Sequence, residues 1–459
     1  MAKRHLFIFG LLLGAGALAA SGCSDTKATS IDDDDAGEAG AKSEAGSGNA
    51  GTGTGGHAGA HMGGGSSAGE AGAMSEGGMG GEGGEAGGSS EPPYEFPSSL
   101  NPQGVVVIAP TPASSTKLLV GASDYMTKKG EVVSITIASG AVGDSQTYDD
   151  KDSVTVSSAG IGFALERTND KLYQLDGGKI SKTFDLKDLG TNKPVTGTKA
   201  YVPFLNQSLI AVLDLTAGTI SHRIDLNEYN AAGDSDHSAE IAEGVYDANS
   251  KIAYFLLQRI DIKTINLASN YHLPCADRSA MIVGIDTRID DVIDLNGEAP
   301  GKGIELKLAN PRSLSLNKDG DTLYLLAEGC YEGANKALQG IEVVSLSDAS
   351  TTVAYEATGT DYLSRMIRTV GADALIESLD PAGATHWHKI DLAQGTLGNE
   401  ISNVPQAPSF DGADLLGVEV TGNVGKVVRY KIATETSTQI SPTSWGGEYS
   451  YTSSTALVQ

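Results

Sequence analysis

The sequence predicts an all-β fold, a β-propeller of seven four-stranded blades, and three observations lead to it. One phrase recurs along the chain: "AVLDLTAGTI" (211–220) and "HKIDLAQGTL" (388–397) follow the same pattern. Several copies of the phrase succeed one another at about 40 residues, the usual length of a propeller blade. No long segment shows the periodicity of an amphipathic helix.

Each copy of the phrase is an alternating apolar strand, a few turn residues rich in Gly, Ser, Thr and Asp, and the start of another strand. Period-two alternation bounded by such residues predicts a β-hairpin. The recognisable copies lie at 132–142, 171–180, 211–220, 282–293, 342–353, 388–397 and 427–440.

A second strand pair precedes several copies, and the clearest is "NPRSLSLNKDGDTLYLLAEG" (310–329), with Asp-Gly at its turn. The segments 242–258 and 158–175 show the same pattern of two strands joined by a turn. Two hairpins per unit give a four-stranded antiparallel sheet, and longer steps between units indicate insertions, most clearly at 259–280. An irregular pair of β-sandwiches is the alternative architecture. An eight-bladed ring is another, if the insertion contains a blade.

The first 22 residues have the layout of a secretory signal peptide. Lys3, Arg4 and His5 form a basic start, and the apolar stretch that follows ends near Ala20. This stretch is shorter than the roughly 20 apolar residues that span a bilayer.

The junction "ASGC", which ends at Cys23, resembles the lipobox of bacterial lipoproteins, although Ala stands where Leu is more common. The resemblance implies that Cys23 becomes the first residue and carries the lipid, palmitate included. Ser24 in place of Asp implies, by analogy with Gram-negative lipoproteins, the outer membrane or cell surface. An ordinary signal peptide with an incidental cysteine is the alternative.

Residues 23–95 are rich in Gly, Ala, Ser and Glu and contain almost nothing to bury. Such a composition cannot recover the entropy lost on ordering, so we expect a disordered tether. Residues 96–459 then form the propeller. The whole chain has a net charge of −26, which argues against nucleic acid and anionic lipid as partners because both require basic patches. Contact with the membrane is expected through the lipid anchor only.

Two resemblances to known families follow. The segment "KAYVPFLNQSLIAVLDLTAGTISHRIDL" (199–226) resembles the surface-layer YVTN propeller repeat, and "PRSLSLNKDGDTLYL" (311–325) is similar to the other half of that repeat. The layout of lipobox, Gly-rich tether and divergent propeller resembles propeller lipoproteins of siderophore loci, including the myxochelin type. This implies a ligand- or partner-binding module, accessory to siderophore and iron uptake. Its ligand would be an anionic small molecule such as a ferric siderophore, and its partner an outer-membrane receptor.

Residues 96–459 contain no Gly-x-Ser-x-Gly elbow, no His-Glu-x-x-His motif and no phosphate-binding glycine loop at a strand–helix junction. No catalytic residue, metal or cofactor is therefore predicted. A propeller enzyme of the lactonase or quinoprotein-like dehydrogenase kind stays the alternative, because such enzymes assemble their sites from channel-facing residues of many blades.

Arg365 and Arg368 in "LSRMIRTV" are candidates to line the channel mouth and meet an anionic ligand, since guanidinium groups bind planar anions in a bidentate manner. Salt bridges to nearby carboxylates are the alternative. On a strand, His386 and His388 point to one face and Trp387 to the other. Two histidines are too few for a zinc site. Ile390 and Leu392 share their face and look buried between blades, so packing between blades is the favoured role of the pair. His386, Trp387 and His388 are also candidates for ligand binding. Further loop candidates for ligand binding are Lys128, Lys129, Tyr271 and Arg278.

Lipidation of Cys23 leaves Cys275 and Cys330, an even number in a secreted chain. Disulfides form and persist in oxidising compartments. The sequence therefore predicts a Cys275–Cys330 disulfide that ties the insertion at 259–280 to the next blade.

Overall fold

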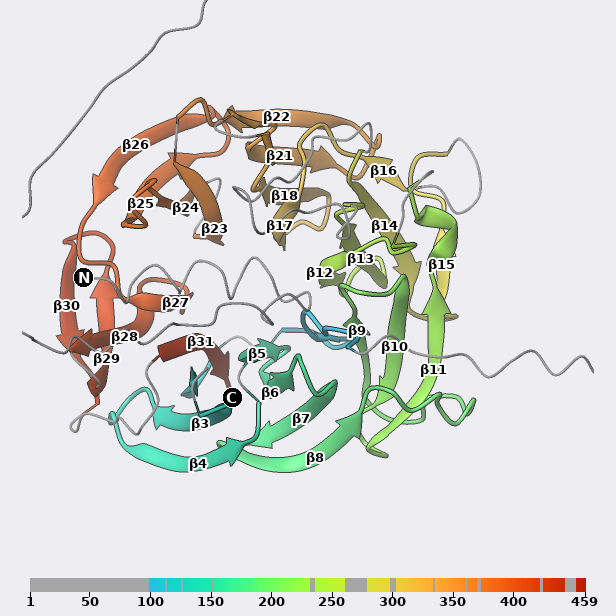
Figure 1. Cartoon of the computed structure of the whole chain (residues 1–459), viewed down its shortest axis with the longest axis horizontal. Helices are drawn as coiled ribbons and strands as arrows, with labels where there is room; N and C mark the ends of the chain where they lie inside the picture. The colour runs from blue at the N-terminus through green and yellow to red at the C-terminus, as the bar shows by residue number, and fades with distance from the viewer. Residues whose placement is uncertain are drawn as a thin grey trace, which may run out of the picture. The chain divides into compact units, whose positions relative to one another are not determined.

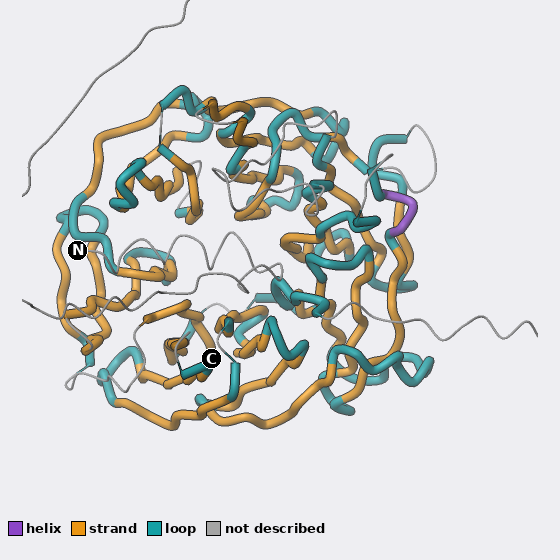
Figure 2. Tube along the Cα trace, viewed as in Figure 1, coloured by secondary structure: helices purple, strands orange, loops and turns teal. Residues whose placement is uncertain are grey.

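A computed structural model describes residues 99–459, except 112–113, 125–126, 151, 232–235, 261–278, 298–302, 333–334, 360, 370–372, 422–423 and 442–450. In this part of the chain, seven blades of four antiparallel strands are arranged in a ring (Figure 1). The described residues include one short 3-10 helix, η2 (Asn227–Tyr229), which Figure 2 draws in purple. The predicted seven-bladed, all-β propeller is confirmed.

The blades are numbered here in ring order, and each is given from its innermost to its outermost strand. Blade 1 contains β5 (Ser153–Ser158), β6 (Ile161–Glu166), β7 (Lys171–Asp176) and β8 (Lys179–Asp185). Blade 2 contains β1 (Val106–Val107), β9 (Lys199–Pro203), β10 (Leu209–Asp214) and β11 (Thr219–Asp225). Blade 3 contains β12 (Ile241–Asp247), β13 (Ile252–Leu257), β14 (Met281–Asp286) and β15 (Asp291–Ile293), and β16 (Ile304–Glu305) also pairs with β14.

Blade 4 contains β17 (Pro311–Leu316), β18 (Thr322–Ala327), β21 (Gly340–Ser345) and β22 (Thr351–Glu356), and the hairpin of β19 (Cys330–Glu332) and β20 (Asn335–Ala337) stands between β18 and β21. Blade 5 contains β23 (Tyr362–Arg368), β24 (Asp373–Leu379), β25 (Thr385–Asp391) and β26 (Thr396–Ile401). Blade 6 contains β27 (Gln406–Phe410), β28 (Leu415–Thr421), β29 (Val424–Lys431) and β30 (Thr436–Gln439). Blade 7 contains β31 (Tyr451–Val458), β2 (Lys117–Asp124), β3 (Lys129–Thr136) and β4 (Val142–Tyr148).

The recurring phrase is the hairpin between the third and fourth strands of a blade, and all seven copies lie there. Its Asp ends the third strand and caps the turn: Asp214 Oδ1 accepts hydrogen bonds from the amides of Thr216 and Ala217, both at 2.9 Å. Asp391 does the same for the next turn residues of its blade. Asx turns of this kind explain why Asp recurs at this point. The following glycine has a positive φ, +73° at Gly218, which a side chain would strain.

The second predicted hairpin is correctly placed in blades 3 and 4, where 242–258 and 310–329 contain the first two strands. It is misplaced in blade 1. There 158–175 contains β6 and β7, the second and third strands, while the first hairpin joins β5 to β6. The insertion at 259–280 follows β13, and most of it lies outside the described residues.

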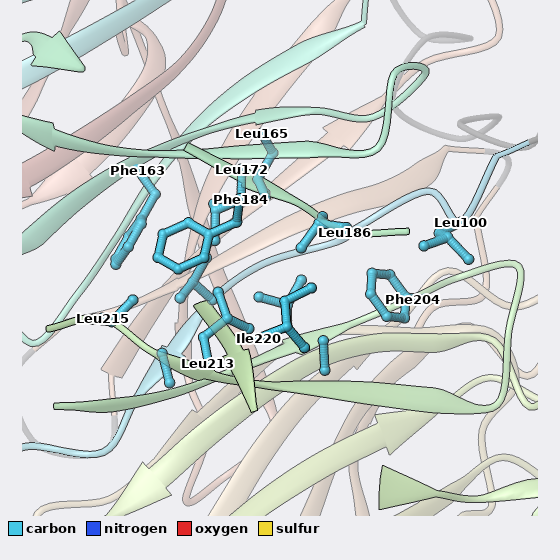
Figure 3. Packing of buried hydrophobic residues seen from close by; sticks show 14 of the residues in the cluster. Leu100, Phe163, Leu165, Leu172, Phe184, Leu186, Phe204, Leu213, Leu215 and Ile220 are labelled. Carbon is cyan, nitrogen blue, oxygen red and sulfur yellow. The ribbon is translucent and has the colours of Figure 1, made fainter. Parts of the chain in front are cut away.

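The hydrophobic core consists of separate layers, one between each pair of neighbouring blades. Figure 3 shows the layer between blades 1 and 2, where Phe163 and Phe184 face Leu213 and Ile220. Alternate side chains of each strand therefore enter the two adjacent layers, because both faces of every blade are covered.

The two ends of the described chain each supply the innermost strand of a blade. The C-terminal strand β31 pairs with β2 and becomes the innermost strand of blade 7. The first strand, β1, pairs with β9 and becomes the innermost strand of blade 2. The ring is thus closed by two strands, one from each end.

The antiparallel pattern defines two faces of the ring. All innermost strands begin at one face, named the upper face here, where the turns between second and third strands also lie. The third-to-fourth-strand hairpins lie at the opposite, lower face. The chain reaches β1 from the upper face, because Ser99 to Asn101 precede the start of this strand.

Candidate functional site

The charged residues of the innermost strands are confined to one part of the ring. Within the described strands, β31, β5, β1 and β27 contain no charged residue. All charged residues of the described innermost strands belong to blades 3, 4 and 5, in β12, β17 and β23. We call these residues the charged sector; they are Glu243, Asp247, Arg312, Arg365 and Arg368.

At the upper end of the sector, Arg312 lies between two glutamates. Its Nε is 3.1 Å from Glu328 Oε1, and the Glu328 side chain is only 5% exposed. Burial raises the pKa of Glu328, and the Arg312 charge opposes this rise. Burial likewise raises the pKa of Glu243, whose Oε2 accepts a hydrogen bond of 2.9 Å from the Leu314 amide. Glu243 thereby caps the β-bulge in β17.

Two buried amides extend this cluster toward blade 3. Asn310 Nδ2 donates to Glu328 Oε2 at 3.1 Å, which turns its oxygen toward Gln258. Gln258 Nε2 donates to that oxygen at 2.7 Å. The relay fixes the orientation of both amides and ties the ends of β13 and β18 together.

In blade 5, Arg365 is directly opposite Glu377 of β24. Arg365 Nε lies 3.8 Å from Glu377 Oε2, and these side chains are 26% and 20% exposed. Ser364 Oγ donates to the same Glu377 oxygen at 3.0 Å. The expected salt-bridge alternative for Arg365 is therefore present, but at a distance beyond that of a hydrogen bond.

Arg368, predicted beside Arg365, points to the other side of the blade. Its guanidinium lies over the Tyr324 ring of blade 4, 3.8 Å from the ring centroid. This is a close cation–π contact. The two arginines thus belong to the same innermost strand, but they face different neighbouring blades.

In β25, Trp387 and Ile390 enter different core layers, as alternation along a strand requires. Ile390 and Leu392 pack between blades 4 and 5, on the face predicted to carry His386 and His388. His386 Nδ1 lies 2.8 Å from Glu400 Oε1, and this hydrogen bond raises the pKa of His386. Trp387 is 4% exposed and lies in the core layer between blades 5 and 6.

The other predicted residues are not brought to the charged sector. Lys128 and Lys129 lie exposed at the β2–β3 turn of blade 7, on the upper face. Cys330 begins β19 and is 1% exposed, so it is buried rather than in an open loop. Cys23, Tyr271, Cys275 and Arg278 lie outside the described residues, so the anchor and the disulfide stay predictions.

Sequence reasoning missed Glu243, Arg312 and Glu328. A signal for the first two was available, because each interrupts the first strand of a repeat unit with a charge. Their meeting was not predictable, since it depends on the packing of blade 3 against blade 4. Across the described residues, no group of three or more His, Cys, Asp and Glu side chains is placed to hold a metal ion. No helix in the described part of the chain is long and apolar enough to cross a membrane.

No protein-family model matches the sequence, and no curated protein matches it. Several solved structures are similar in fold. One is a periplasmic gluconolactonase of Pseudomonas aeruginosa, 14% identical with a TM-score of 0.45, for which the match covers 75% of this chain and 99% of the other. A protein of unknown function from Desulfotomaculum acetoxidans is 9% identical, with a TM-score of 0.47 and coverage of 74% and 99%. TolB of Acinetobacter baumannii is 10% identical, with a TM-score of 0.41; the match covers 74% of this chain and 66% of TolB. Similarity at this level says nothing about activity.

Proposed function

We propose that this protein is a lipid-anchored, extracytoplasmic propeller that binds a small anionic ligand in the charged sector, without chemical conversion. One observation supports the proposal most directly: the charged residues of the innermost strands are confined to three adjacent blades. Removing charged side chains from water is costly unless they are paired. The concentration of these charged side chains in three adjacent blades therefore favours a role in recognition.

The chemistry of the sector favours binding over catalysis. Glu328 and Glu243 accept hydrogen bonds and interact with Arg312, an arrangement that suits a fixed ion-pair cluster. Three arginines in two neighbouring strands supply the donors that carboxylates, phosphates and catecholates require.

The described chain enters the ring at the upper face, at the same end as Arg312. Ser99 to Asn101 reach the propeller at the upper face, held there by Asp170. An anchor at Cys23 with the tether 23–95 would therefore join the ring on the side where the innermost strands begin. A receptor in the same membrane is then the partner that this face suits best.

The finer hypotheses rest on the sequence resemblances. These are the YVTN type of repeat, a ferric siderophore as ligand and an accessory role in iron transport. The arginines of the sector are compatible with a catecholate complex and equally with a carboxylate or a phosphate.

Binding can be tested on the full-length chain in detergent by isothermal titration calorimetry. The probes are ferric 2,3-dihydroxybenzoate, citrate and inorganic phosphate. In a Trp445→Phe background, Trp387 is the sole tryptophan, and it lies opposite Glu377 in the strand pairing. We expect one or more probes to bind and to change its fluorescence. No heat and no fluorescence change with any probe, or hydrolysis of a lactone by the purified chain, would overturn the proposal.

A further inference from the structure

Arg365 differs from the other arginines of the charged sector in the partners that it has. Arg312 pairs closely with Glu328 and Arg368 stacks on Tyr324. Among the described residues, the 3.8 Å ion pair with Glu377 is the one polar contact of the Arg365 guanidinium. Its five N–H donors thus lack close acceptors among the described residues, although guanidinium groups normally form several hydrogen bonds when partly buried.

Arg365 faces the junction between blades 5 and 6, where the described innermost strands share fewer hydrogen bonds than at most other junctions. Ile367, on the same side of β23, packs between blades 5 and 6. No hydrogen bond joins β23 to β27 in the part of the chain that the structure describes. Side chains do tie innermost strands elsewhere, through Val107 N to Ser158 Oγ (2.8 Å), Thr155 N to Ser454 Oγ (2.6 Å), Ser409 Oγ to Thr455 O (3.1 Å), Leu314 N to Glu243 Oε2 (2.9 Å) and Met366 N to Ser313 Oγ (3.1 Å).

We propose that Arg365 is the anion receptor of the charged sector, and that Glu377 is a built-in counter-ion which the ligand replaces. This rests on the proposed function, since it assumes that the ligand enters the sector. Glu377 keeps the charge of Arg365 balanced while the site is free. It stays in place through Ser364 Oγ and leaves the donors of the guanidinium fork available.

The geometry specifies the class of ligand. Two parallel N–H groups of a guanidinium match the two oxygens of a planar carboxylate, and such bidentate pairs are stronger than a single contact at 3.8 Å. A ligand with a carboxylate can therefore outcompete Glu377, whose contact with Arg365 is long. A neutral ligand gains nothing at this point. The receptor should accordingly prefer carboxylates such as citrate and benzoate to their amides.

The experiment compares variants of the full-length chain in calorimetric titrations with citrate and benzoate, and with benzamide as the uncharged probe. Arg365→Gln should weaken carboxylate binding about tenfold or more, because it removes charge-assisted hydrogen bonds. Glu377→Gln should tighten it about two- to fivefold, because it removes the competing carboxylate and keeps an acceptor for Ser364. Arg288→Gln is the matched control. This arginine is exposed at a lower-face turn of blade 3 and pairs with Asp286.

The outcomes separate this inference from the proposed function. If the parent chain binds neither these probes nor ferric 2,3-dihydroxybenzoate or inorganic phosphate, the proposed function fails; if it binds one of the latter two but no carboxylate, this inference alone is wrong. If the parent chain binds carboxylates, but Glu377→Gln weakens binding or leaves it unchanged, or Arg365→Gln has no effect, the assignment of receptor and counter-ion is wrong. Circular dichroism verifies that each variant is folded. Arg365→Lys adds a second readout, since it keeps the charge, loses the fork and should recover only part of the affinity.

Discussion

Asp170 fixes the point at which the N-terminal segment joins the propeller. Its side chain is fully buried, and Oδ1 accepts hydrogen bonds from the amides of Leu100 (2.7 Å) and Asn101 (3.2 Å). Oδ2 lies 3.1 Å from Lys187 Nζ. In the variant Asp170→Ala the Leu100 amide loses its acceptor inside the protein, while the Asn101 amide keeps Ser99 Oγ at 3.2 Å. We therefore expect the segment that contains β1 to open far more often.

The magnitude follows from these contacts. The Leu100 amide left without a partner costs about 1–3 kcal/mol, and the loss of the longer Asp170 contacts of Asn101 and Ser99 adds about 0.5 kcal/mol each. The total is about 3 kcal/mol, or about a hundredfold in the opening equilibrium.

Native-state hydrogen exchange of the peptide 99–108 measures this opening directly. We expect its exchange to accelerate about a hundredfold in Asp170→Ala, while β10 exchanges as before. Asp144→Ala is the matched control, because Asp144 forms an exposed ion pair with Lys179 and should stay within about threefold of the parent chain. Equal exchange in the two variants would show that Asp170 does not hold the segment.

Three further predictions concern the anchor, the disulfide and pH. Cys23→Ser should move the protein from the membrane fraction to the soluble fraction; unchanged fractionation would disprove the lipid anchor. Alkylation of the denatured, non-reduced chain followed by intact-mass analysis should find Cys275 and Cys330 protected, and two added alkyl groups would refute their disulfide. The Glu400 contact raises the pKa of His386, so protonated His386 stabilises the folded state at acidic pH and this contribution is lost as pH rises through that pKa. In urea unfolding, His386→Ala should therefore lower the midpoint more at pH 5.5 than at pH 8, and an equal effect at both would contradict the assignment.

The blade hairpins were predictable because their signals are local. Period-two alternation, an Asp that caps the turn and a glycine with positive φ lie within a dozen residues, as in 211–220 and 388–397. The same local rules placed Ile390 and Leu392 on a buried face of β25. The predicted first hairpin of blade 1 was wrong because β6 and β7 also alternate, and alternation alone does not distinguish the first and second strands of a blade from the second and third.

The candidate site was predictable only in part. The preference of Arg365 and Arg368 for anions follows from their chemistry, and their place on a strand of the repeat follows from the pattern. Their partners do not. Glu377 meets Arg365 through the register of β23 with β24, and Tyr324 meets Arg368 because blades 4 and 5 pack face to face.

By itself, then, the sequence determined the repeat, the strand pattern and the number of blades, since these depend on residues close together in the chain. Only the tertiary structure decided how the ring closes and which blades carry the charged residues of the innermost strands. The pairing of β31 with β2 joins the two ends of the described chain, and β1 reaches past blade 1 to pair with β9. The sequence of neither strand identifies the strand with which it pairs, because any strand edge offers the same backbone donors and acceptors. Each of the two strands pairs with an inner edge that the other strands of its blade leave uncovered.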